Sequence, residues 1–97
     1  MISLEVESFL ALIADENEVK AANTLCITQS TLSRRLTSLE KELGYKLFLR
    51  RKGKRNIELT DAGRKFAVIA LKMKALWQET HELEPQEKTI NFRIAAS

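Results

Sequence analysis

The stretch from Thr28 to Leu43 constrains the fold more than any other, because its two faces need different partners. Leucines recur there at i, i+4, i+7 and i+11, so one side of the predicted helix buries against a core. The other side is hydroxylic and cationic, and its short Ser and Thr side chains allow close approach to a polyanion such as the major groove of DNA. The leucines are Leu32, Leu36, Leu39 and Leu43, and the polar sector comprises Ser30, Arg34, Thr37 and Lys41 with Ser33 and Ser38 at its edges.

The positive charge of the chain is concentrated around this helix. Residues 28–55 hold nine basic and two acidic side chains, residues 1–27 hold one basic and five acidic, and residues 56–97 hold six of each. A basic cluster on a helix and on the loop that follows it indicates a polyanionic partner, most commonly nucleic acid.

Other broad classes of protein are disfavoured. No run of 18 apolar residues and no basic N-terminal leader are present, so we expect a cytoplasmic protein with no membrane partner. The single cysteine, Cys26, excludes an internal disulfide and a thiolate metal cluster. Neither a metal site nor a cofactor is expected.

Capping residues divide the first half of the chain into three helices. Ser3 and Asn17 are predicted N-caps of a first helix and of a short second helix that ends near Leu25, and Thr28 is the predicted N-cap of the two-faced helix. About three residues join the second and third helices, as in a helix-turn-helix. Gly44 follows the last leucine and ends the third helix in a left-handed conformation.

A β-hairpin with a basic tip is predicted next. Residues 47–50 and 56–59 have strand composition, and Gly53 suits the turn between them. Such a hairpin is a wing beside the helix-turn-helix, and its crowded cations favour nearby phosphates. A solvated loop is the alternative, since charge runs alone are often only that. The predicted DNA contacts of the wing are Arg50, Arg51, Lys52, Lys54 and Arg55.

A long fourth helix begins after Thr60 and is predicted to run to about Glu84, where Pro85 stops it. It is longer than the helices beneath it, so part of its apolar surface is predicted to pack against a second copy. Residues 90–94 alternate as a strand does, and we expect them to open a second domain absent from this chain. The predicted dimerisation residues are Phe66, Ile69, Met73, Leu76, Trp77 and Leu83.

Two motifs resemble the N-terminal domain of LysR-type transcriptional regulators, a bacterial winged helix-turn-helix family. The first is Ala21-Ala22-x-x-Leu25-x-x-Thr28-Gln29-Ser30-x-Leu32-Ser33-x-x-Leu36-x-x-Leu39-Glu40-x-x-Leu43-Gly44-x-x-Leu47-Phe48-x-Arg50, and the second is Leu59-Thr60-x-Ala62-Gly63. The resemblance implies a mainly α fold, with three helices and a two-stranded wing in residues 1–59, a linker helix in 60–84, and a hinge with the first strand of an effector-binding domain in 85–97.

The resemblance also implies function. It implies double-stranded DNA as partner, read at promoter inverted repeats with a T-N11-A core, and a homodimer through the linker helix that becomes a tetramer in a full-length protein. A small-molecule effector would act only through the absent C-terminal domain. The family's groove-reading residues fall on Gln29, Ser30, Thr31, Ser33 and Arg34, and Thr28, Thr37 and Lys41 complete the predicted contact set of the helix.

The chain departs from the family pattern at two places. Ser30 stands where Pro is common, which predicts an altered sequence preference, and Asn17-Glu18 stand where Ser-Phe is common. Glu18 therefore predicts the loss of a usual apolar contact.

Two other functions are compatible with parts of this sequence to different degrees. A protein-interaction winged helix would use the long helix as its working surface and the basic wing only for solubility. An enzyme has little support, because the chain has one histidine, one cysteine and no Gly-rich phosphate loop. Cys26 is expected to be a small packing residue and His81 a solvated one.

Overall fold

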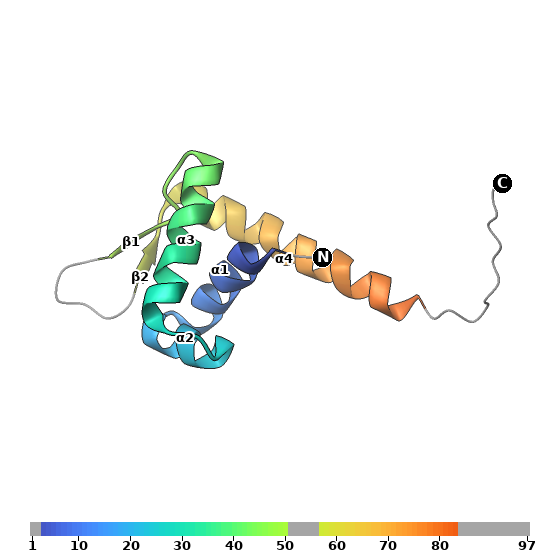
Figure 1. Ribbon diagram of the computed structural model, residues 1–97. Helices are drawn as coiled ribbons and strands as arrows, with labels where there is room; N and C mark the ends of the chain where they lie inside the picture. Colours follow the sequence, from blue (N-terminus) through green and yellow to red (C-terminus); the bar gives the residue numbers. More distant parts are fainter. Residues whose placement is uncertain (1–2, 51–56, 84–97) are drawn as a thin grey trace.

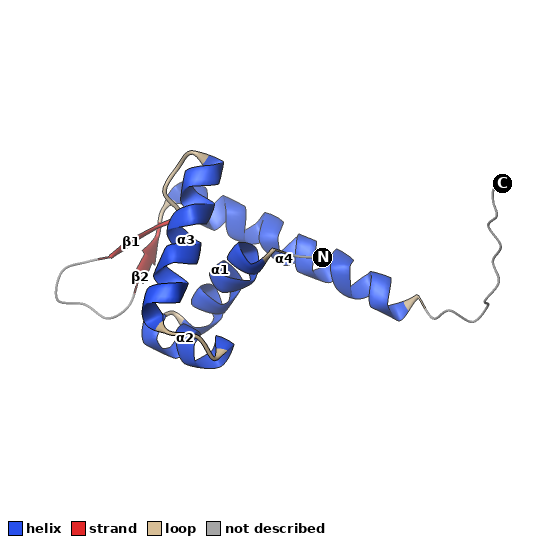
Figure 2. Cartoon of the chain, in the orientation of Figure 1, coloured by secondary structure: helices blue, strands red, loops and turns tan. Residues whose placement is uncertain are grey.

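The computed structural model describes residues 3–50 and 57–83, and within them it contains four helices and a two-stranded antiparallel sheet (Figures 1 and 2). This is the predicted mainly α, winged helix-turn-helix architecture. The elements in order are α1 (Leu4–Asp15), α2 (Glu18–Leu25), α3 (Gln29–Leu43), β1 (Phe48–Arg50), β2 (Ile57–Leu59) and α4 (Asp61–Glu82).

Each helix begins at the predicted N-cap. The side-chain oxygen of each cap accepts a hydrogen bond from a backbone N–H of the first turn, which satisfies a donor that has no partner inside the helix. The caps are Ser3, Asn17, Thr28 and Thr60, and they accept from Val6, from Val19 and Lys20, from Thr31 and from Gly63.

The turn between α2 and α3 is tight. Cys26 adopts a left-handed conformation with φ of 59°, and the N–H of Ile27 donates to the carbonyl of Ala22 over 3.0 Å. Cys26 is exposed, so the expectation that it packs inside is wrong. Its place at the end of α2 explains this, because the chain must reverse there before α3 can start.

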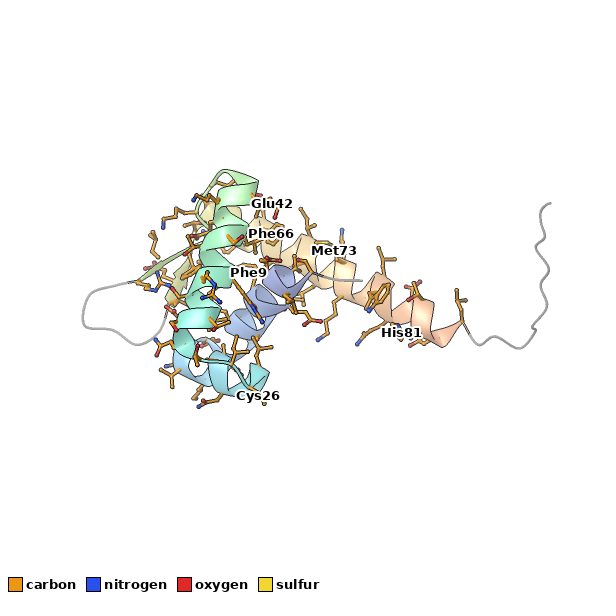
Figure 3. The ribbon with its side chains drawn as sticks, viewed as in Figure 1. Phe9, Cys26, Glu42, Phe66, Met73 and His81 are labelled. Carbon is orange, nitrogen blue, oxygen red and sulfur yellow. The ribbon has the colours of Figure 1, made fainter. Side chains whose placement is uncertain are left out.

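The core lies where α1, α2, α3 and the first half of α4 meet. Phe9 of α1 is fully buried, and its ring centroid lies 5.5 Å from that of Phe66 in α4 (Figure 3). Leu32, Leu36 and Leu39 are buried, as the leucine stripe of α3 predicts. The polar face of α3 is therefore turned to the outside.

The wing is attached to α3 through a carboxylate. Glu40 accepts hydrogen bonds from the N–H groups of Leu47, at 2.8 Å, and Phe48, at 3.4 Å. The strands pair in the register Phe48↔Leu59, Leu49↔Glu58 and Arg50↔Ile57. The first strand starts one residue later than predicted, and residues 51–56, which include the basic tip, lie outside the described residues.

The first half of α4 packs in the core, and its second half projects away from the domain. Gly63, Phe66, Ala67 and Ala70 face the domain and are buried, whereas the second half extends away from the other helices (Figure 1). The predicted dimer role of Phe66 needs correction, since this side chain belongs to the core of its own chain. In the described ranges, no helix is long and apolar enough to cross a membrane. The predicted hinge and strand in 85–97 lie outside those ranges.

Candidate nucleic-acid interface

A shallow hollow lined by polar residues lies on the outer face of α3. Its volume is about 550 Å³, and its lining includes no apolar residue. The leucine stripe fixes this orientation, because burying it turns the opposite side of the helix outward. The structure thus brings together the six polar residues predicted to share a face, which are Ser30, Ser33, Arg34, Thr37, Ser38 and Lys41.

The first turn of α3 carries hydroxyl groups that are partly engaged with one another. Thr28 Oγ1 lies 2.9 Å from Thr31 Oγ1 and 3.3 Å from Ser30 Oγ. Thr31 is half-buried, whereas Gln29 and Ser30 are exposed. Gln29 and Ser30 are therefore better placed than Thr31 to reach a ligand from this end of the helix.

The two longest side chains of the hollow are cationic. Arg34 and Lys41 are exposed, and neither makes an ion pair with another described residue. Cations without an internal partner are free to pair with phosphate or with acceptor atoms on base edges. The short Ser and Thr side chains between them leave room for a groove edge to approach the helix.

Arg50, at the end of β1, is held by an acidic side chain of α2. Its Nε and Nη2 donate to the two carboxylate oxygens of Glu18, at 2.5 Å and 3.2 Å, and Nη2 also lies 3.3 Å from Ser33 Oγ. The guanidinium carbon sits 5.0 Å from the ring centroid of Phe48. This cluster joins α2, the wing and α3.

Glu18 and Arg50 interact strongly within this cluster. The hydrogen bond with Glu18 is the main cause that raises the pKa of Arg50 above its usual value, against an opposing effect of burial. The pair therefore favours the charged form of Arg50. Glu18 is buried, with 8% of its surface exposed.

Sequence reasoning missed the role of Glu18. The prediction concerned only the loss of an apolar contact, whereas the carboxylate has a charged partner 32 residues away. The available signal was an acid at a position where the family commonly has an apolar residue. A buried acid requires a partner, and Arg50 is that partner.

Exposed apolar side chains line the projecting part of α4. Ile69, Leu76 and Leu83 are more than half exposed, and Trp77 is 37% exposed. Met73 is partly buried and packs against the core, so it is not fully available to a partner. Beside Trp77, a groove of about 440 Å³ lies between α4, one side of α1 and the end of α2.

No cluster of potential metal ligands occurs in residues 3–50 and 57–83. His81 lies edge-on to Trp77 with ring centroids 5.0 Å apart, on the projecting part of α4 (Figure 3). The predicted wing contacts Arg51, Lys52, Lys54 and Arg55 fall outside these ranges.

Comparison with known proteins assigns the family. Residues 5–64 match the family described as bacterial regulatory helix-turn-helix protein, lysR family. The chain belongs to the LysR family. It is 34% identical over 93 residues to the LysR-family transcriptional regulator BenM of Acinetobacter baylyi, which covers 92% of this chain and 30% of BenM. It is also 34% identical over 93 residues to the regulator HdfR of Escherichia coli, covering 95% of this chain and 33% of HdfR. The chain thus spans about a third of the length of these LysR-family relatives.

Solved structures of LysR-family members agree with this. The DNA-binding domain of BenM in complex with catB site 1 DNA superposes with a TM-score of 0.77 at 32% identity, covering 86% of this chain and 87% of that one. The complex of the CbnR DNA-binding domain with DNA gives a TM-score of 0.76 at 30% identity, covering 84% and 92%. The relatives are transcriptional regulators, which argues against an enzyme.

Proposed function

We propose that this chain is the DNA-binding part of a LysR-family transcriptional regulator and binds promoter DNA sequence-specifically as a homodimer. The observation that carries the proposal is the exposed hollow on α3, whose lining residues each carry a hydrogen-bond donor and include two cations. A helix of this kind fits the major groove, where it can reach base edges. The DNA complexes of BenM and CbnR domains support the proposal by likeness.

On the outer face of α3 and its first turn, we assign two kinds of contact. Gln29, Ser30 and Arg34 would read bases, because they are exposed and lie in the first half of the helix. Thr37 and Lys41 lie further along the same face and would contact backbone phosphate. Thr28, Thr31 and Ser33 are secondary contacts, since part of their hydrogen-bonding capacity is used within the protein.

The Arg34→Ala variant is expected to lose about 1–3 kcal/mol of affinity for its specific site, a factor of about 5 to 150. The loss arises because a bidentate contact with a base edge disappears. Binding to random duplex should fall much less, so discrimination between the two should relax. Fluorescence-anisotropy titrations of both duplexes measure the two affinities.

Arg35→Ala is the matched control, since Arg35 is a neighbouring cation on α3 that does not line the hollow. It should leave the ratio of specific to random affinity unchanged. Equal losses on specific and random DNA for Arg34→Ala would remove its assignment as a base reader.

The wing tip is proposed to contact flanking backbone or the minor groove. This proposal rests on sequence, because four cations, Arg51, Lys52, Lys54 and Arg55, are crowded into five positions around Gly53. Such density is compatible with phosphate neutralisation and carries no base-specific pattern.

The dimer is proposed to form through α4. The helix has 22 residues, or about 33 Å, and it carries several large apolar side chains that its own chain leaves exposed. Exposed apolar side chains on one helix are typical of an interface with a second copy. Ile69, Leu76, Trp77 and Leu83 are the proposed contacts, with Met73 at their edge.

A charge in this surface is expected to separate the protomers. Leu76 is 60% exposed, so Leu76→Glu should leave each protomer folded while weakening dimerisation by about 2 kcal/mol or more, about 30-fold. Light scattering at micromolar concentration should then report the 11.1 kDa monomer, where the unchanged chain reports twice that mass.

The control for this variant is Glu82→Lys, which changes charge at an exposed position of the same helix about 120° around its axis from Leu76. It should remain dimeric. A dimeric Leu76→Glu protein would contradict the assignment of this surface.

The remaining assignments follow from the family. We propose that residues 1–59 bind DNA, that 60–84 link and dimerise, and that 85–97 lead into an effector-binding domain. In a full-length protein, that domain would bind a small-molecule effector and complete a tetramer. A regulator that binds the bacterial chromosome would work in the cytoplasm.

A further inference from the structure

Three elements of the DNA-binding domain meet at one guanidinium group. Glu18 begins α2, Ser33 lies on α3, and Arg50 ends β1 just before the wing tip. The carboxylate of Glu18 takes two N–H groups of Arg50, and Ser33 lies within reach of a third. The wing is thereby fixed against both helices of the helix-turn-helix.

Most N–H donors of the guanidinium are engaged within the protein, although the side chain is half exposed. It has five N–H donors, and the Glu18 and Ser33 contacts use the edge formed by Nε and Nη2. Phe48 lies against its flat side. Only the Nη1 edge has no partner among the described residues.

The ion pair is expected to stay closed when DNA binds. If the ion pair opened, the Glu18 carboxylate, which is 8% exposed, would be buried without a cation. The phosphates of the bound DNA would also lie near it. An unpaired buried charge is strongly unfavourable, and the nearby phosphates would repel it. A phosphate contact of Arg50 does not compensate for both losses.

We therefore propose that Glu18 is a positioning residue that keeps Arg50 bound to the protein in the DNA complex, so that Arg50 orients the wing on the recognition helix and neutralises no phosphate. This rests on the proposed DNA-binding function and revises the predicted role of Arg50 as a phosphate contact. The carboxylate lowers non-specific attraction to DNA and fixes the direction in which the wing leaves the domain.

The test is the salt dependence of binding to a random-sequence duplex, which counts neutralised phosphates. Glu18→Gln keeps the shape of the side chain and removes its charge, which frees Arg50 for phosphate. The slope of log K against log salt should steepen by about 0.9 per protomer, about 1.8 per dimer. Affinity at low salt should rise.

Two further variants isolate the cause. Glu42→Gln removes the same charge from an exposed position of α3 that has no ion pair among the described residues, and its slope should equal that of the unchanged chain. In an Arg50→Gln background, Glu18→Gln should no longer alter the slope. The double variant Glu18→Gln/Arg50→Gln leaves no unpaired buried charge; its slope should equal that of the unchanged chain, and this result decides the matter if either single variant does not fold.

The outcomes separate this inference from the proposed function. Steep salt dependence in the unchanged chain, with a slope that Glu18→Gln does not alter or that the double variant lowers by about 0.9 per protomer, overturns the positioning role and leaves DNA binding intact. Salt-independent, weak binding by the unchanged chain overturns both.

Discussion

The affinity of the dimer for duplex DNA is expected to fall about 10³- to 10⁵-fold between 50 and 200 mM salt. The range corresponds to about six to ten neutralised phosphates per dimer, each of which releases a condensed counterion. Lys41 on α3 and the four cations of the wing tip are enough to neutralise this number of phosphates. Arg34 neutralises a further phosphate where it contacts the DNA backbone. Titrations of one labelled duplex at several salt concentrations measure the slope.

Lys41→Gln is expected to lower this slope by about 0.9 per protomer, because one phosphate contact is lost. Lys72→Gln is the matched control, since Lys72 is exposed on α4, away from the hollow of α3. A slope near zero in the unchanged chain would mean that the basic residues only solubilise the protein, as the interaction-module alternative requires.

Gly63→Ala is expected to destabilise the fold by about 3 kcal/mol or more, at the upper end of the cost of overpacking. A Cβ atom at this position would lie 1.8 Å from the carbonyl oxygen of Leu47. That carbonyl cannot retreat freely, because it accepts the N–H of Thr60 at 3.0 Å and precedes β1. The first turn of α4 and the wing are in contact through this glycine, so thermal unfolding should shift down by about 12 °C or more.

Gly44→Ala adds the same atom in open space, with nothing within 4 Å, and costs only the left-handed conformation at φ of 87°. About 1–2 kcal/mol is expected there. Denaturant unfolding of both variants gives the comparison. Equal losses at the two positions would show that contact with Leu47 does not matter.

Most of the fold follows from short-range chemistry. The N-caps Ser3, Asn17, Thr28 and Thr60 and the C-terminal Gly44 act on their own helix ends, so local sequence is enough to locate them. The leucine stripe of α3 fixes which side faces out, and the polar hollow follows from it. The family motif and the periodicity agree on this helix.

The sequence pattern could not predict pairing between residues that are far apart in the chain. Nothing local links Glu18 to Arg50, and a run of basic residues gave no reason to separate Arg50 from its neighbours. The dimer role of Phe66 was misjudged for a related reason. The sequence of α4 did not show which side of its first half the domain covers, and Phe66 lies in the core while Ile69 and Leu76 are exposed.

Selection of binding sites from a random duplex library tests the central claim most directly, because it needs no known operator. We predict enrichment of an inverted repeat, with half-sites one helical turn or a multiple apart, since a dimer places two recognition helices in successive major grooves. Arg34→Ala should lose the preference at one position of each half-site. Sequences no different from the input library, recovered with a folded and dimeric protein, would contradict sequence-specific DNA binding.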